Sequence, residues 1–219
     1  HTLPHPGSPG TAVRIQPGTE IGKFFLFKSA GYDENGMALI YDKDENIIPY
    51  DRRNPETDRR YIGKSIPKLT LSWGHDLRYK QWDLNIYMRS WLGYDVFNVN
   101  EMYYGIPTSL SNGRNVLKDA VTKNAFISKD NPRLLTDEWL ENGSFLKVDV
   151  ITLGYTFNRK MIRPLANARI YLTGRDLFTI TGYKGLDPEI NVNGLEPGFE
   201  DVNAYPRTRT FMLGIQIGF

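Results

Sequence analysis

The chain has 219 residues, enough for one sizeable core or two small ones, and its 27 Lys and Arg nearly balance its 25 Asp and Glu. This balance argues against a nucleic-acid partner, which requires a basic face, and the absence of Cys excludes a disulfide framework or a thiolate metal site. No apolar run approaches the about 20 residues of a membrane helix, but a membrane β-barrel would also give only a weak hydropathy signal.

Residues 1–20 are rich in Pro and Gly, and we expect a loop or linker there instead of a signal peptide. Helix signals are few, and short loop helices are expected only within 116–128 and 134–140. Strand signals, in contrast, recur along the chain and predict about seven strands. The expected strands are 22–29, 36–41, 67–79, 82–92, 145–157, 168–178 and 207–219.

The last strand has the most regular pattern, because apolar residues alternate with small or polar ones. Successive side chains of a strand point to opposite faces, so this alternation predicts one apolar and one polar face. The residues of the apolar face, which we expect to face lipid, are Phe211, Leu213, Ile215, Ile217 and Phe219.

Strand length and connector length both favour a membrane barrel. Most of the expected strands exceed the about 5 to 6 residues of globular strands and match the about 9 to 11 that a tilted membrane strand needs. The connectors alternate between long and short, as in barrels with long extracellular loops and short periplasmic turns. Loops 93–144 and 179–206 are therefore expected outside the cell.

The strand at 145–157 fits less well, because its apolar residues change face partway along. A β-bulge near Ile151 would restore the pattern. The aromatic residues Trp73, Tyr79, Trp82 and Phe219 are expected near the periplasmic strand ends, where they would form a membrane-interface girdle. The alternative is a soluble β-sandwich, a carbohydrate-binding module whose core these aromatics would cap.

Five ordered motifs carry a family resemblance. They are NGSFLK at 142–147, LGY at 153–155, GRDLFT at 174–179, YKGLDPE at 183–189 and YPRTRT at 205–210. The segment from about residue 20 to the end resembles the C-terminal barrel portion of SusC/RagA-type TonB-dependent transporters of the bacterial outer membrane.

The resemblance implies an all-β fold in which residues 21–219 supply antiparallel strands to a large transmembrane barrel of about 22 strands. It also implies TonB-dependent import of oligosaccharides or peptides, and that the C-terminal Phe219 is part of the signal read by the barrel-assembly machinery. The implied partners are the remainder of the barrel with its plug, a SusD-like surface lipoprotein, the TonB system and outer-membrane lipid. About seven strands cannot close such a barrel, so we expect the plug, the TonB box and the signal sequence to lie outside this chain.

No catalytic constellation is visible, so neither an enzyme nor a cofactor is expected. The three histidines, His1, His5 and His75, do not have metal-ligand spacing. One weak calcium-like pattern has EF-hand spacing and consists of Glu189, Asn191, Asn193 and Glu200. A Glu at its first position and Pro197 at its ninth depart from the pattern, so a polar extracellular loop is the preferred interpretation and no metal site is expected.

Tyr103 and Tyr104 lie in the longest expected loop. Aromatic rings stack on sugar rings, so both are candidate ligand contacts. The alternative is that they pack this loop against its neighbours or against a lid protein.

Overall fold

The computed structural model describes residues 12–158, 165–192, 194–200, 202 and 204–219. The chain divides into two compact units, each built from three separate segments. The core unit comprises His1–Pro67, Tyr94–Gly143 and Tyr183–Ala204, and the sheet unit comprises Lys68–Gly93, Ser144–Gly182 and Tyr205–Phe219. Among the described residues, no helix has the length and apolar character needed to cross a membrane.

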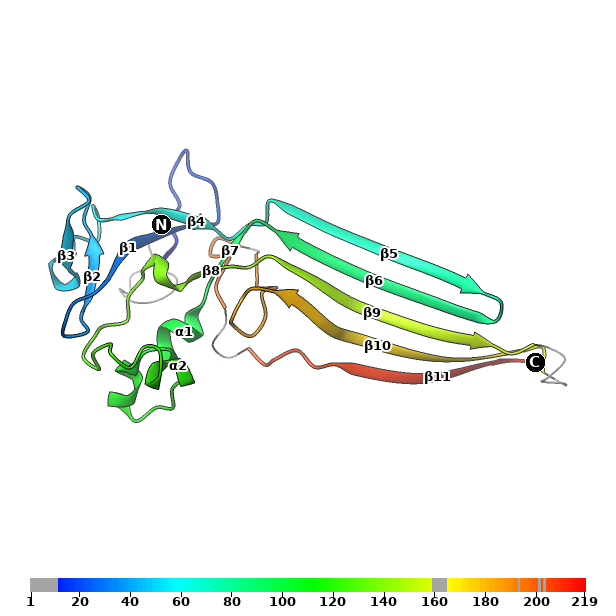
Figure 1. The fold of residues 1–219 in the computed structure, drawn as a ribbon. Coiled ribbons are helices and arrows are strands. Elements are labelled where there is room, and N and C mark those ends of the chain that lie inside the picture. The colour runs from blue at the N-terminus through cyan, green and yellow to red at the C-terminus, as the bar shows by residue number, and fades with distance from the viewer. Residues whose placement is uncertain (1–11, 159–164, 193, 201, 203) are drawn as a thin grey trace. The chain divides into compact units, whose positions relative to one another are not determined.

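The sheet unit is one antiparallel sheet of five strands in the order β11-β10-β9-β6-β5 (Figure 1). Its strands are β5 (Leu69–Tyr79), β6 (Trp82–Leu92), β9 (Phe145–Thr156), β10 (Asn167–Thr181) and β11 (Thr210–Gly218). They contain 11, 11, 12, 15 and 9 residues, which confirms the long strands expected from the sequence. A tight turn joins β5 to β6, whereas residues 93–144 separate β6 from its sheet neighbour β9.

The expected bulge in β9 is confirmed, with its extra residue at Asp149. Val148 and Val150 pair with the consecutive β6 residues Met88 and Tyr87, so Asp149 has no partner on that strand. The inserted residue keeps the apolar side chains before and after it on the same face. These side chains are Leu146, Val148, Ile151, Leu153 and Tyr155, which all pair with even-numbered residues of β6.

The first two expected strands do not belong to this sheet, and the prediction of seven strands in one barrel wall is corrected to five. β1 (Lys23–Tyr32) and β2 (Ala38–Tyr41) form a separate four-stranded sheet with β3 (Ile47–Pro49) and β4 (Arg59–Lys64), in the order β3-β2-β1-β4. The physical reason is visible in β1, where four consecutive residues, 24–27, are buried. A strand buried on both faces needs a protein core, not a boundary between lipid and water.

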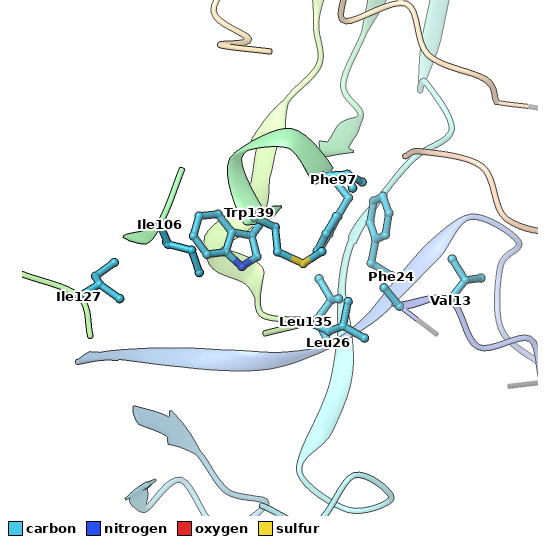
Figure 2. Close-up of a cluster of buried hydrophobic side chains, with 11 residues drawn as sticks. Val13, Phe24, Leu26, Phe97, Ile106, Ile127, Leu135 and Trp139 are labelled. Carbon is cyan, nitrogen blue, oxygen red and sulfur yellow. The ribbon is translucent and has the colours of Figure 1, made fainter. Parts of the chain in front are cut away.

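The core unit is completed by short elements around one apolar cluster. These elements are η2 (Tyr50–Arg52), β7 (Asp95–Phe97), α1 (Val99–Tyr104), η3 (Pro107–Asn112), α2 (Lys118–Val121), η4 (Asp137–Trp139) and β8 (Leu140–Asn142). Thus α2 and η4 fall within the two segments where short helices were expected. Figure 2 shows the buried cluster, in which Phe24 of β1 lies beside Phe97 of β7, and Leu26 lies beside Leu135.

Asn98 caps α1, and we expect Asn98→Ala to lower the free energy of unfolding by about 1 to 2 kcal/mol. Its side chain accepts a 2.9 Å hydrogen bond from the backbone N–H of Glu101 and donates a 2.9 Å bond to Glu141. Asn98→Ser is the matched control, because Ser preserves the cap and loses only the bond to Glu141. Urea unfolding followed by Trp139 fluorescence would test this, and equal losses for both variants would contradict a capping role.

Candidate functional site

The candidate functional site is the five-stranded sheet itself, whose two faces differ in chemistry. On one face, a row of leucines crosses all five strands in direct cross-strand register. The row consists of Leu77, Leu84, Leu153, Leu172 and Leu213. Four of these side chains are exposed, with Leu77 at 55 % and Leu213 at 71 %, and Leu84 is half-buried. Exposing a contiguous apolar row to water is unfavourable, so this face requires an apolar environment.

The residues of the last strand that were expected to face lipid lie on this leucine face. Leu213, Ile215 and Ile217 pair with Leu172, Ile170 and Ala168 of β10, and Phe211 pairs with Gly174. All four are exposed, and so is Phe219, which follows β11. These side chains therefore lie on one exposed face, as contact with lipid would require. Lipid contact itself stays a prediction.

Aromatic side chains gather at one end of the leucine face. Tyr79 pairs with Trp82 beside the β5–β6 turn, and Trp82 pairs with Tyr155 at a ring distance of 4.9 Å. Phe157 adds a further ring 5.1 Å from Tyr155. The expectation for Trp73 is wrong, because Trp73 lies within β5 opposite Met88, away from this end. The other rings lie together at this end, as an aromatic band at a membrane interface would require, and the interface itself stays a prediction.

The opposite face is polar and carries two Arg–Asp ion pairs among the described residues. Arg169 of β10 binds Asp83 of β6 across β9, with 3.0 Å between Nε and Oδ1. Arg89 donates from Nη2 to Oδ1 of the bulge residue Asp149, also at 3.0 Å. Closer to the centre, the hydroxyls of Thr152 and Thr173 hydrogen-bond at 2.9 Å, and Asn85 donates to Asp76 at 2.7 Å.

Two glycines keep this polar face flat. Gly214 pairs with Tyr171, and a Cβ on Gly214 would lie 2.2 Å from Cζ of the tyrosine ring. Gly154 lies under the Arg169–Asp83 pair, where a Cβ would be 2.6 Å from the carboxylate oxygens of Asp83. Because both positions lack a side chain, the tyrosine and the ion pair can lie across the neighbouring strands.

We expect Gly214→Ala to destabilise the folded sheet by about 1 to 3 kcal/mol, because the Tyr171 ring must move away from the new methyl group. The heat resistance of the folded protein on gel electrophoresis would measure the loss. The matched control is Gly214→Ala in a Tyr171→Ala background, where the clash is absent and the glycine substitution should cost clearly less. Equal costs in the two backgrounds would contradict the proposed contact.

Tyr103 and Tyr104 lie in the last turn of α1, and both are half-buried. Tyr103 packs against the apolar cluster, the guanidinium of Arg133 lies 4.6 Å from its ring centre, and Ser109 donates to its carbonyl oxygen. These contacts agree with the alternative that Tyr103 packs the loop. The ligand role of the two tyrosines stays a prediction.

The calcium-like residues that the structure describes make hydrogen bonds within the protein. The buried Glu200 carboxylate accepts hydrogen bonds from Asn100 Nδ2 at 2.7 Å and from the backbone N–H of Leu186 at 2.5 Å. The backbone N–H of Glu189 donates to Asp187, and the carbonyl of Asn191 accepts from Gly198. Asn193 lies outside the described residues. Within the described part of the chain, no group of three or more His, Asp or Glu side chains has a metal-binding arrangement.

The ion pairs of the polar face were not predicted from the sequence. Asp83 and Arg169 are separated by 86 positions, so their contact depends on the sheet order, which one sequence does not reveal. The available signal was the recurrence of charged residues at every second position of several strands.

An antiparallel sheet with strands of this length, an exposed leucine face and an ion-paired polar face has the pattern of a membrane β-barrel wall. No family model matches the chain. Curated proteins do match, among them TonB-dependent receptor P3 of Formosa agariphila, which is 25 % identical over 230 residues, covering 94 % of this chain and 23 % of the relative. TonB-dependent receptor SusC of Bacteroides thetaiotaomicron is 29 % identical over 233 residues, covering 97 % of this chain and 21 % of the relative.

Solved structures agree on the fold. The RagAB peptide importer in its open-open state superposes with a TM-score of 0.69 at 24 % identity, covering 94 % of this chain and 24 % of the matched chain. The resemblance to SusC/RagA-type TonB-dependent receptors is thus confirmed, and so is the all-β fold class. The chain spans about a fifth to a quarter of the length of these relatives. The relatives are receptors and an importer, in agreement with the expectation that this is not an enzyme.

Proposed function

We propose that the sheet unit is part of the wall of an outer-membrane barrel that imports nutrients in a TonB-dependent manner. Its leucine face contacts lipid, its polar face lines the barrel interior, and loops 93–144 and 179–206 lie outside the cell. The observation that carries the proposal is the leucine row, which crosses five strands in register and is exposed on four of them. Only a closed barrel lets such strands cross a bilayer, so further strands complete the wall on both edges of this sheet.

The proposed substrate is an oligosaccharide, taken up with a SusD-like surface lipoprotein, as the resemblance to SusC/RagA-type transporters implies. A peptide is the second candidate, because the structural neighbour RagAB is described as a peptide importer. That likeness supports the fold alone at its level of identity, so it does not displace the oligosaccharide. The plug and the TonB system complete the proposed machinery.

The rival function is a soluble carbohydrate-binding β-sandwich, which would bury the leucine row beneath a second sheet. Producing the full chain with and without detergent separates the two. We expect it to need detergent and partner strands. A soluble monomer that melts cooperatively without detergent would contradict the barrel proposal.

Transport itself is tested in cells that carry or lack the protein to which this chain belongs. We expect labelled oligosaccharide uptake to be lost both when that protein is deleted and when TonB is depleted. A labelled peptide mixture serves as the parallel arm. Peptide uptake with the same two dependences, and no oligosaccharide uptake, would replace the substrate but retain the transporter.

A further inference from the structure

The two faces of β1 are covered in different ways. Phe24 and Leu26 point into the apolar cluster. Phe25 and Phe27 lie on the other face, where they pair with Tyr61 and Arg59 of β4. This second face of the core unit therefore carries aromatic and cationic side chains together.

Three guanidinium groups lie on this aromatic surface, and we call Arg14, Arg53 and Arg59 the arginine cluster. Cζ of Arg14 lies 4.9 Å from the ring centre of Phe25, and Cζ of Arg59 lies 5.9 Å from the same centre. Arg59 also lies 5.1 Å from the ring of Phe27. The guanidiniums of Arg14 and Arg59 thus share one ring.

The third guanidinium is joined to this arrangement through Tyr50. The ring of Tyr50 lies 5.6 Å from that of Phe27, and Cζ of Arg53 lies 3.9 Å from the centre of the Tyr50 ring. Arg53 is held in this place by a 3.0 Å hydrogen bond from Nη1 to the carbonyl of Tyr50. Cation–π contacts of this kind fix the position of a guanidinium without neutralising its charge.

One acidic side chain beside the cluster is that of Glu56. Glu56 lies 3.8 Å from Arg14, and its side chain is 77 % exposed. Burial lowers the pKa of Arg59, and the neighbouring charges of Arg53 and Arg14 lower it further, whereas Glu56 acts in the opposite direction. The adjacent Arg60 differs, since it binds the Glu45 carboxylate and the carbonyl oxygen of Asp42.

We propose that the arginine cluster binds the carboxylate or sulfate groups of an anionic oligosaccharide, with the half-exposed rings of Tyr50 and Tyr61 beside it for the sugar. The planar guanidinium fork matches the paired oxygens of these anions, and a bound anion offsets the repulsion among three like charges. The inference rests on the proposed function, because it names the substrate class of the same importer. Aromatic rings beside the charges favour a saccharide over an acidic peptide.

The test measures binding to the full-length protein in detergent by calorimetry, with tetragalacturonate, neutral cellotetraose and a tetraglutamate peptide as probes. We expect tetragalacturonate to bind at least about tenfold more tightly than cellotetraose, with an affinity that falls as salt is raised. Arg14→Gln and Arg53→Gln should each remove most of that preference. Arg14 and Arg53 are chosen because Arg59 packs against the rings of both Phe25 and Phe27, so replacing it would also disturb packing.

Arg60→Gln is the matched control. It removes one positive charge from β4, beside Arg59 but outside the cluster, and it should leave the preference unchanged. Equal affinity for the acidic and neutral saccharides would overturn the inference, as would a preference that survives both cluster variants. Binding of tetraglutamate but not of tetragalacturonate would also overturn it, in favour of a peptide. Uptake of a neutral oligosaccharide by cells carrying the cluster variants shows separately whether the proposed transport function stands.

Discussion

Leu213→Lys is expected to remove most of the assembled protein from the outer membrane, whereas Met212→Lys, one residue away, is expected to be tolerated. Leu213 belongs to the leucine row, and Met212 pairs with Thr173 on the polar face. A Lys on the lipid face costs about 2 to 4 kcal/mol at the bilayer midplane and about 0 to 1 kcal/mol near the interfaces, while a Lys facing the interior avoids lipid.

The position was chosen from the register of the sheet. Ile215 is also on the leucine face, but its row continues through Ile170 and Tyr155 to Trp82, at the aromatic end. Leu213 lies one row further from that end, so its substitution should cost more than Ile215→Lys. The measurement is the amount of heat-modifiable protein in outer-membrane fractions of cells that make the full-length protein. Equal yields of the Leu213 and Met212 variants would contradict the assigned faces.

The long sheet was predictable because each of its strands separates an apolar face from a polar face along its length. Alternation in β11 follows directly from the two faces, and it could be read without knowing any partner strand. The sheet to which β1 belongs was predicted wrongly because β1 lacks this alternation. Its FFLF segment is apolar at consecutive positions, which is compatible with a strand but says nothing about which sheet it joins.

Features that depend on pairing were harder to predict. The bulge was expected from the change of face in 145–157, but its position at Asp149 follows from which residues β6 places opposite it. The arginine cluster brings Arg14 together with residues of β1 and β4 that are remote in sequence. No spacing rule links these positions, so this candidate site required the fold.

Phe97→Ala is expected to destabilise the core unit by about 3 to 5 kcal/mol. Phe97 is fully buried in the apolar cluster, beside Phe24 (Figure 2). The ring centres of Phe24 and Phe199 lie 6.2 and 5.7 Å from that of Phe97. Removing its ring leaves a cavity between β1 and β7 that rigid backbone pairing on both strands prevents from closing. The loss of stability is therefore the lost free energy of transferring the ring out of water plus the cost of the cavity that remains.

Hydrogen exchange of the full-length protein, read by mass spectrometry on peptides from residues 12–67 and 94–143, measures this effect. The slowest amides of these peptides should exchange faster by about two to three orders of magnitude in the Phe97→Ala variant. Phe126→Ala removes the same ring from a side chain that is 62 % exposed and makes one edge contact with Tyr32, so it should change exchange by less than about tenfold. If both variants accelerated exchange equally, the cluster around Phe97 would not be the core that holds this unit together.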